Sequence, residues 1–175
     1  SLSDKVFDAL NAGAVDFVAK PAVSNRAQLE EFIRNELLVK IKIASTVKIS
    51  KIKKTVTMQQ QHMLVRGGNK IVAIGASTGG TEAIFSVVKN FGTDIPGVVV
   101  TQHMPPGFTS MYAKRLNDQC RIQVKEAQTG DRALPGHMLL APGGDMHMHL
   151  LKVNGVYQVE CKRGPKVNGH CPSVD

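Results

Sequence analysis

Near the start of the chain, apolar residues recur at the spacing of a helix in two places. The first repeat covers residues 6–12 and stops at Gly13, a residue suited to the left-handed turn after a helix. The second repeat covers residues 29–37, and Ser24 or Asn25 is placed to cap its start. The pattern therefore predicts two helices in this part of the chain.

A short run between these helices, residues 16–19, predicts a strand. Lys20 and Pro21 follow it, and the strand is expected to end there because proline lacks a backbone donor and restricts the residue before it. Helix, strand and helix over residues 1–40 are typical of the last part of an α/β unit. Such a segment is too small to form a core of its own.

The later part of the chain alternates between strand and helix patterns. Residues 70–75 and 97–102 are runs of β-branched and small apolar residues, which predict two buried parallel strands. The helical patterns 81–88 and 107–117 follow these strands, and residues 154–155, an Asn-Gly pair, indicate a late β-hairpin. This alternation predicts an α/β fold, a doubly wound parallel sheet with helices on both faces.

The excess positive charge of the chain lies in one segment. The formal net charge is +8, yet no acidic residue occurs between Glu36 and Glu82, whereas eight lysines and arginines do. Residues 41–69 in this span are rich in Ser, Thr and Gln and lack aromatic side chains. They predict a basic flexible linker between residues 1–40 and 70–175. An arm that binds nucleic acid is the alternative, which the lack of aromatic stacking platforms disfavours.

Length and composition restrict the class of protein. The chain has 175 residues, 42% of them hydrophobic and 21% charged, as expected of a globular protein with room for one ordinary domain or pieces of two. It has neither an apolar stretch of roughly 20 residues nor a cationic leader, so membrane insertion and secretion are not expected. Its three cysteines show no C-x-x-C spacing, which argues against disulfides and a cysteine-rich zinc site. These features favour a cytoplasmic location.

The turn after the predicted strand 70–75 has the composition of a nucleophile elbow. Ser77 stands at its tip between Gly75 and Gly79, in a G-x-S-x-G spacing directly before a predicted helix. Glycines allow the sharp turn, and the helix start aims backbone N–H groups at a developing oxyanion. A phosphate or dinucleotide loop is the alternative; it fits less well because G-x-G-x-x-G and the P-loop lysine are missing.

A serine hydroxyl needs a base to take its proton, and His103 is the histidine best placed to do so. It follows the predicted strand 97–102 as Ser77 follows the strand 70–75. The carboxyl ends of neighbouring parallel strands meet at one edge of a sheet. We therefore expect Ser77 and His103 to lie together if the two strands are neighbours.

The other histidines are weaker candidates. His62 falls in the linker, His137 precedes an apolar strand and His170 lies in a loop. His147 and His149 share one face of a predicted strand and would suit a metal, but two ligands without a third and fourth indicate a solvated face. No metal site is expected among these residues.

Residues 9–21 resemble the end of a response-regulator receiver domain, which has a flavodoxin-like fold. In that family the lysine before the proline contacts a phosphoryl group on an aspartate of an earlier strand, and Lys20 matches it. The phosphoacceptor and the acidic pocket for magnesium lie upstream in the family and have no counterpart here. The resemblance implies that residues 1–40 are the last third of a receiver domain, with magnesium needed only at the missing phosphorylation site.

Five segments after the linker resemble the catalytic domain of the chemotaxis protein-glutamate methylesterases. They follow the family's order within residues 70–175 and are 72–80, 102–109, 127–131, 140–148 and 167–175. Receiver, basic linker and esterase is also the family's domain order. The chain is therefore expected to be a piece of such a protein, truncated at both ends and with an incomplete catalytic domain.

The resemblance implies hydrolysis of glutamyl methyl esters on the cytoplasmic domains of chemoreceptors, giving glutamate and methanol, with deamidation of receptor glutamines as a second activity. By position, Ser77 is the nucleophile, His103 the general base and the Thr78 backbone N–H a candidate oxyanion donor. A chemotaxis histidine kinase would be the phosphodonor, and phosphorylation of the receiver would relieve a block over the site. Catalysis needs no cofactor in this family.

Two departures from the family pattern matter. The family's catalytic aspartate lies in a Gly-Met-Gly-x-Asp-Gly motif that these residues lack, so they are expected to be poorly active, and the missing later strands leave a sheet edge unpaired. Cys171 stands where the family has arginine, which removes a cation that would suit an acidic receptor surface.

A non-catalytic regulatory module that docks on chemoreceptors is the alternative function.

Overall fold

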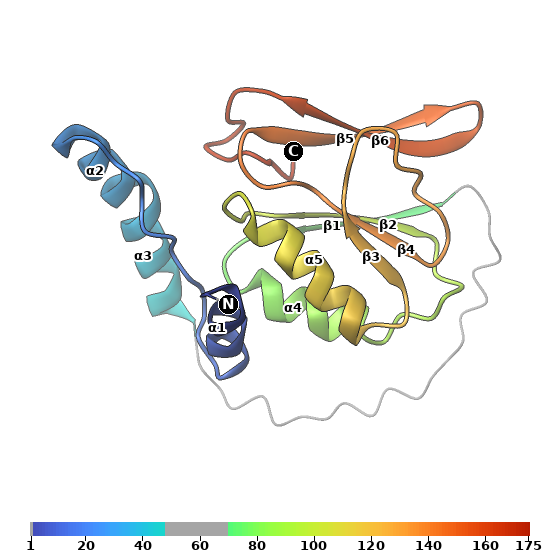
Figure 1. Cartoon of the computed structure of the whole chain (residues 1–175), viewed down its shortest axis with the longest axis horizontal. Coiled ribbons are helices and arrows are strands. Elements are labelled where there is room, and N and C mark those ends of the chain that lie inside the picture. Colours follow the sequence, from blue (N-terminus) through green and yellow to red (C-terminus); the bar gives the residue numbers. More distant parts are fainter. Residues whose placement is uncertain (1, 48–69) are drawn as a thin grey trace.

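The computed structural model describes residues 2–47 and 70–175 (Figure 1). Residues 48–69, which make up most of the expected linker, lie outside the described residues. The flexible linker therefore stays a prediction over that span.

Four parallel strands form the central sheet, in the order β1-β2-β4-β3. Strand β2 is central and buried, and its successive side chains point to opposite faces: Val98 and Val100 pack into one layer and Val99 into the other. The predicted parallel α/β class is confirmed. The strands are β1 (Ile71–Ala76), β2 (Gly97–Gln102), β3 (Gln123–Glu126) and β4 (His137–Leu140).

Strand β1 is not the buried strand that its composition predicts. It pairs with β2 alone, and its residues are half-buried or exposed. Within residues 2–47 and 70–175 no strand lies on its other side. A run of β-branched residues fits a half-covered edge as well as a covered centre, because Val72 and Ile74 still pack against the helices on one face.

Helices α4 (Gly80–Val88) and α5 (Phe108–Gln119) cover one face of the sheet (Figure 1). Their apolar sides form the main core with the side chains of β2, β3 and β4. The two helices are joined by a buried hydrogen bond in which the Tyr112 hydroxyl donates to the Thr81 carbonyl at 2.6 Å. Burial raises the pKa of Tyr112, so its hydroxyl stays protonated and remains a donor.

The other face of the sheet is covered by a β-hairpin rather than by a helix, which corrects the expectation of helices on both faces for the described residues (Figure 1). The hairpin consists of β5 (Met146–Val153) and β6 (Val156–Arg163). Val159 of β6 packs against Val99 and Leu139 of the sheet. Asn154 and Gly155 both have positive φ, so the expected Asn-Gly turn is confirmed.

The hairpin lies on this face because the order in which successive strands join the sheet changes direction after β3. The connections from β1 to β2 and from β2 to β3 run one way along the sheet, with α4 and α5 on the same face. The chain then returns from β3 to β4, and a right-handed return must cross the opposite face. Residues 127–136 make that crossing as a loop, which bonds to β6 through Gly130, Asp131 and Ala133.

The N-terminal segment, residues 2–47, is mainly helical. It contains α1 (Leu2–Asn11), α2 (Arg26–Phe32), the π-helical turn η1 (Ile33–Leu37) and α3 (Leu38–Thr46). Gly13 has a φ of 111° after α1, and the Asn25 side chain accepts a hydrogen bond from the Gln28 N–H, so both predicted helix boundaries are confirmed. Helix α3 continues to Thr46, beyond the predicted linker start at 41.

The strand predicted at residues 16–19 is wrong. The segment is not a strand, because nothing in the described residues forms a ladder with it. A strand needs a neighbour to complete its backbone hydrogen bonds. Lys40 of α3 supplies one of the hydrogen bonds that a neighbouring strand would make: its ammonium group donates to the Phe17 carbonyl at 2.9 Å. The same group pairs with Asp16 at 3.4 Å.

The N-terminal segment packs against the helix layer. Phe7 and Leu10 of α1 are buried in the main core, and the Phe7 ring stacks on Tyr112 of α5 with a centroid separation of 5.7 Å. The ring of Phe17 lies 4.8 Å from that of Phe108, the first residue of α5. The described helices include none with the length and hydropathy to cross a membrane.

Tyr112→Phe is expected to lower the free energy of unfolding by about 1 kcal/mol, because it removes only the buried hydrogen bond between α5 and α4. Urea unfolding followed by circular dichroism measures the change. Tyr157→Phe is the matched control, since the Tyr157 ring is half-buried and no hydrogen bond of its hydroxyl occurs in the described parts of the chain. Equal losses in the two variants would contradict the role of the Tyr112 hydroxyl.

Candidate active site

Ser77 lies in the tight turn between β1 and α4. Gly79 caps the helix with a φ of 75°, and the Gly80 N–H closes the turn by donating to the Ser77 carbonyl at 2.8 Å. Gly79 supplies the left-handed conformation that most residues avoid. The result is a sharp strand-to-helix turn with the serine exposed at its tip.

His103 follows β2 directly, as predicted. Ala76 and Gln102 are opposite each other in the parallel ladder, and the His103 N–H extends the pairing by donating to the Ala76 carbonyl at 3.1 Å. The His103 Nδ1 atom lies 3.1 Å from the Ser77 Oγ atom. The structure thus brings the two predicted residues into hydrogen-bond contact at the carboxyl edge of the sheet.

A second histidine stacks on one face of the His103 ring. The ring of His170 stacks on it with a centroid separation of 3.8 Å and an interplanar angle of 13°. The other ring nitrogen of His103, Nε2, is buried and has no hydrogen-bond partner within the residues that the structure describes. With Nδ1 accepting from the serine hydroxyl, Nε2 is the protonated atom of the neutral ring.

The surroundings of His103 disfavour its charged form. Burial is the main cause that lowers the pKa of His103, followed by the positive charges of His170 and Lys40, while Asp175 acts weakly in the opposite direction. Hydrogen bonds from Asn168 and Ser173 lower the pKa of Asp175. Its Oδ2 atom accepts both bonds, at 2.9 and 3.1 Å.

The last segment of the chain, residues 167–175, closes over the end of β1. Its turn pairs Val167 with His170 through two backbone hydrogen bonds. The side chain of Val174 occupies the space beside Gly75, where an added Cβ would lie 2.3 Å from it. Cys171 is half-buried in this segment, and burial together with the nearby Asp145 raises the pKa of its thiol.

Thr78 and Lys20 complete the set of predicted residues. Thr78 is the first turn residue after Ser77, and within the described residues its backbone N–H donates no hydrogen bond. Lys20 is exposed at the end of the extended segment before Pro21. Their predicted roles, oxyanion donor and phosphoryl contact, stay predictions.

His147 and His149 do not form the solvated face that the sequence indicates. His147 is buried and makes two structural contacts: its Nε2 atom lies 2.9 Å from the Pro165 carbonyl and its Nδ1 atom accepts from the Ser173 N–H. Only His149 is exposed. Among residues 2–47 and 70–175, no three His, Cys, Asp or Glu side chains are grouped to hold a metal. The described residues therefore offer no donor set for the magnesium of a receiver domain.

Two contributions to the site were missed by reasoning from the sequence. His170 looked like a loop residue, because only the fold of residues 167–175 places it on His103. Gln102 looked like the last residue of a buried strand, yet its side chain bonds to both site turns. Its position in phase with Val98 and Val100 was the available signal, because a polar residue on a buried strand face needs a partner.

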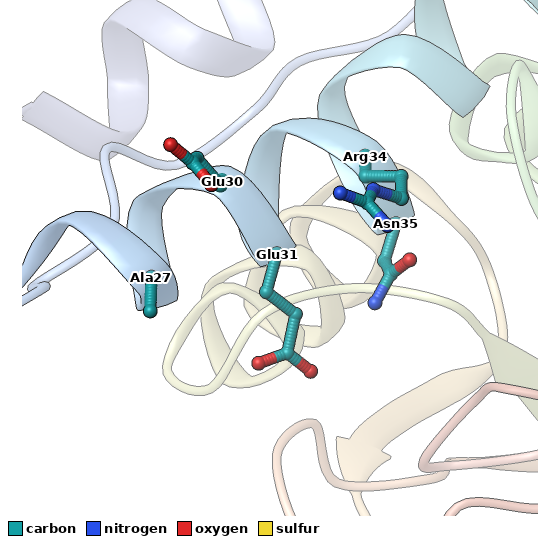
Figure 2. A pocket seen from close by; sticks show the side chains of 5 residues that line it. All are labelled: Ala27, Glu30, Glu31, Arg34 and Asn35. Carbon is teal, nitrogen blue, oxygen red and sulfur yellow. The ribbon is translucent and has the colours of Figure 1, made fainter.

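A separate hollow of about 210 Å³ lies on the outer surface of α2 and η1 (Figure 2). Its lining residues all come from this one helical stretch: Ala27, Glu30, Glu31, Arg34 and Asn35. None of them belongs to the Ser77–His103 site. A surface lined by a single helix encloses no ligand, so this hollow does not define the functional site.

A strand–turn–helix elbow with an exposed serine is a feature of the α/β hydrolases, and here a histidine follows the neighbouring parallel strand. Comparison with known families narrows this class. Residues 72–175 match the family described as CheB methylesterase. The chain belongs to the CheB methylesterase family.

Relatives and a solved structure agree with this assignment. The protein-glutamate methylesterase/protein-glutamine glutaminase 2 of Syntrophomonas wolfei is 51% identical over the whole of this chain and 51% of its own length. The corresponding protein of Syntrophotalea carbinolica is 49% identical over 96% of this chain and 49% of its own length. The chain therefore spans about half the length of the curated relatives it matches.

The solved structure is the catalytic domain of Thermotoga maritima CheB methylesterase. It superposes with a TM-score of 0.58 at 39% identity, covering 62% of this chain and 57% of that chain. The predicted α/β fold class is thereby confirmed. The assignment of residues 1–40 to a receiver domain stays a prediction.

Proposed function

We propose that this chain is part of a protein-glutamate methylesterase and protein-glutamine glutaminase that acts on chemoreceptors. The observation that carries the proposal is the 3.1 Å contact between Ser77 Oγ and His103 Nδ1 in a sharp strand-to-helix turn. Membership of the CheB methylesterase family and the names of the relatives support it. The substrate would be a glutamyl methyl ester or a glutamine side chain of the receptor.

In the proposed reaction, the Ser77 oxygen attacks the ester carbonyl while His103 Nδ1 accepts the hydroxyl proton. The tetrahedral intermediate then breaks its bond to the methoxy group, which leaves as methanol with the proton from His103. Water, activated by the same nitrogen, hydrolyses the acyl-serine to give glutamate. A glutamine substrate follows the same steps and releases ammonia.

The negative charge on the carbonyl oxygen needs hydrogen-bond donors. We assign the Thr78 backbone N–H to this role, because it follows the nucleophile and has no other acceptor in the described residues. The start of α4 adds its partial positive charge at the same place. The elbow thereby serves both the nucleophile and the oxyanion.

A Ser–His pair works best when a carboxylate holds the imidazole in place. Within the described residues, no carboxylate bonds to His103. Nε2 of His103 has no acceptor within the described residues, and the sequence lacks the family's Gly-Met-Gly-x-Asp-Gly motif. Asp175 is not assigned to the role, because its carboxylate is already bonded to Ser173 and Asn168. We therefore expect kcat for these residues alone to be lower by a factor of roughly 10⁴ than with a carboxylate partner in place.

Control of the site is proposed to come from the N-terminal segment. Phe17 packs on Phe108 five residues after His103, and Lys40 is close enough to influence the pKa of His103. In the proposal, a chemotaxis histidine kinase phosphorylates a receiver domain at a site outside these residues, where magnesium is bound and Lys20 contacts the phosphoryl group. The phosphorylated receiver would act on the Ser77–His103 site through the contacts of Phe17 and Lys40.

The proposed location is the cytoplasm.

Methanol release from methylated chemoreceptor tests the function, using the protein with its natural ends and its Ser77→Ala variant. A serine-directed organophosphonate is used in parallel. We expect release and labelling of the parent, and neither with Ser77→Ala. A folded parent that binds receptor but releases no methanol would refute the esterase proposal and favour the docking module.

In this 175-residue chain, turnover is expected to decline in acid with a midpoint below 6.5, the ordinary pKa of histidine. The base acts only when it is neutral, and burial lowers the pKa of His103, so the neutral fraction persists to lower pH. A pH profile of kcat/KM measures this midpoint. Lys40→Gln should move it upward, because it removes a positive charge that lowers the pKa. Lys42→Gln, on the exposed side of the same helix, should leave it unchanged. A midpoint above 6.5 in this 175-residue chain without the Lys40 substitution would contradict the assignment.

A further inference from the structure

We propose that Gln102 is a positioning residue that holds the Ser77 turn and the His103 turn at a fixed separation, an inference that rests on the function proposed above. Gln102 is the last residue of β2 and is 3% exposed. Its Nε2 atom donates to the Ser77 carbonyl at 2.9 Å and to the His103 carbonyl at 3.2 Å. One side-chain amide thus joins the backbones of the nucleophile and the base.

The orientation of this amide is fixed by its partners. Both are carbonyl oxygens, which can only accept hydrogen bonds, so the NH₂ group of Gln102 must face them. The Oε1 atom points the other way, toward Gly80, and is buried with no hydrogen-bond partner in the described residues. The side chain therefore satisfies its donors at the site and leaves its acceptor unpaired.

The bridge acts where the sheet no longer holds the two chains together. The last backbone bond between them is from the His103 N–H to the Ala76 carbonyl. Beyond it, β1 turns into α4 while β2 continues into residues 104–107, so the two segments separate. Only the Gln102 amide and the Ser77–His103 contact join them there, among the hydrogen bonds of the described residues.

The unpaired acceptor shows that packing alone does not account for a glutamine at this position. A buried polar atom without a partner lowers stability, whereas an apolar side chain of similar length would fill the same space without that loss. Methionine has this length and no donor. If Gln102 served only the core, Gln102→Met would have no effect on turnover and would leave stability unchanged or raise it.

The test compares the parent with Gln102→Met in the protein with natural ends. We expect kcat for methanol release to fall about tenfold to a hundredfold and KM to change less than about twofold. The melting temperature should change little, because the loss of the two hydrogen bonds opposes the removal of the unpaired acceptor. Gln102→Glu is the second variant: it keeps the shape but places a carboxylate against two carbonyls, so it should fail to restore turnover. An unchanged kcat in Gln102→Met would overturn the proposal.

Val98→Ala is the matched control for a general loss of stability. Val98 lies on the same strand and faces the same layer, but it is near the opposite end of β2 from both turns. The variant should melt at a lower temperature while kcat per folded molecule stays at the parent value. If Val98→Ala lowered kcat as much as Gln102→Met did, the effect would be one of stability and the positioning role would be wrong.

A structural measurement separates this inference from the proposed function. In this 175-residue chain, where His103 Nε2 has no acceptor within the described residues, the ¹⁵N shifts of the His103 ring report its tautomer, and the contact with Ser77 predicts a neutral ring protonated at Nε2. Gln102→Met should produce a mixture of tautomers. A parent that shows the single tautomer but releases no methanol would refute the esterase and retain the positioning role. A single tautomer in both proteins would refute the positioning role, whatever the activity.

Discussion

Replacing His103 with glutamine is expected to lower kcat for methanol release by at least about 10⁴-fold in the protein with natural ends, with little change in KM. Glutamine keeps the length and polarity of the side chain and still contacts Ser77, but it cannot take a proton from the hydroxyl. Ser77 Oγ lies 3.1 Å from His103 Nδ1, and no other described residue hydrogen-bonds to that hydroxyl. The proton would then have no acceptor of suitable basicity during attack.

His149→Gln is the matched control, because His149 is exposed on the hairpin and its side chain makes no hydrogen bond in the described residues. It should leave kcat unchanged. His170→Gln provides the contrary outcome. The His170 ring stacks on His103 and is the other imidazole at the site. If His170→Gln abolished turnover and His103→Gln did not, the base would be His170 and the proposed assignment would be wrong.

The pairing of Ser77 with His103 could be predicted because each residue directly follows a strand. Once two parallel strands are neighbours, the ends of both lie at one edge of the sheet, and no long-range information is needed. The helices were predictable for a similar reason, since periodic apolar residues and capping residues such as Asn25 are local signals.

The features that were not predictable depend on contacts between distant segments. The stacking of His170 on His103 requires residues 167–175 to close over β1, and no local pattern specifies that path. The hairpin cover requires the sheet to reverse its winding between β3 and β4. The segment 16–19 has a strand composition, but its final structure depends on a neighbour to pair with. The composition of a segment indicates which structures it can form, and the segments that pack or pair with it determine which of these it adopts.

The glycines of the elbow illustrate the same difference at one site. Gly79 and Gly80 are adjacent and look equivalent in the sequence. In the structure, Gly79 has a φ of 75° with open space where a Cβ would be. At Gly80 an added Cβ would lie 2.0 Å from Gln102 Oε1 and 2.7 Å from the Ala76 Cβ. One glycine is needed for its backbone conformation and the other for its lack of a side chain.

Gly80→Ala is therefore expected to be far more harmful than Gly79→Asn. The extra methyl group of Gly80→Ala should push Gln102 away from both carbonyls, lower the free energy of unfolding by about 3 kcal/mol and lower kcat about a hundredfold. Asparagine tolerates the left-handed conformation better than most residues, so Gly79→Asn should cost about 1 kcal/mol and keep most of the turnover.

Urea unfolding and methanol release measure both variants in the protein with natural ends. Their comparison is informative because the two changes are one residue apart and the larger side chain is added at Gly79, where the space is open. If Gly79→Asn were the more damaging variant, the conformation of the elbow would matter more than the space behind it. If Gly80→Ala kept full turnover while Gln102→Met lost it, the Gln102 amide would have an alternative route to its two carbonyls, and the close approach at Gly80 would not be required for the site.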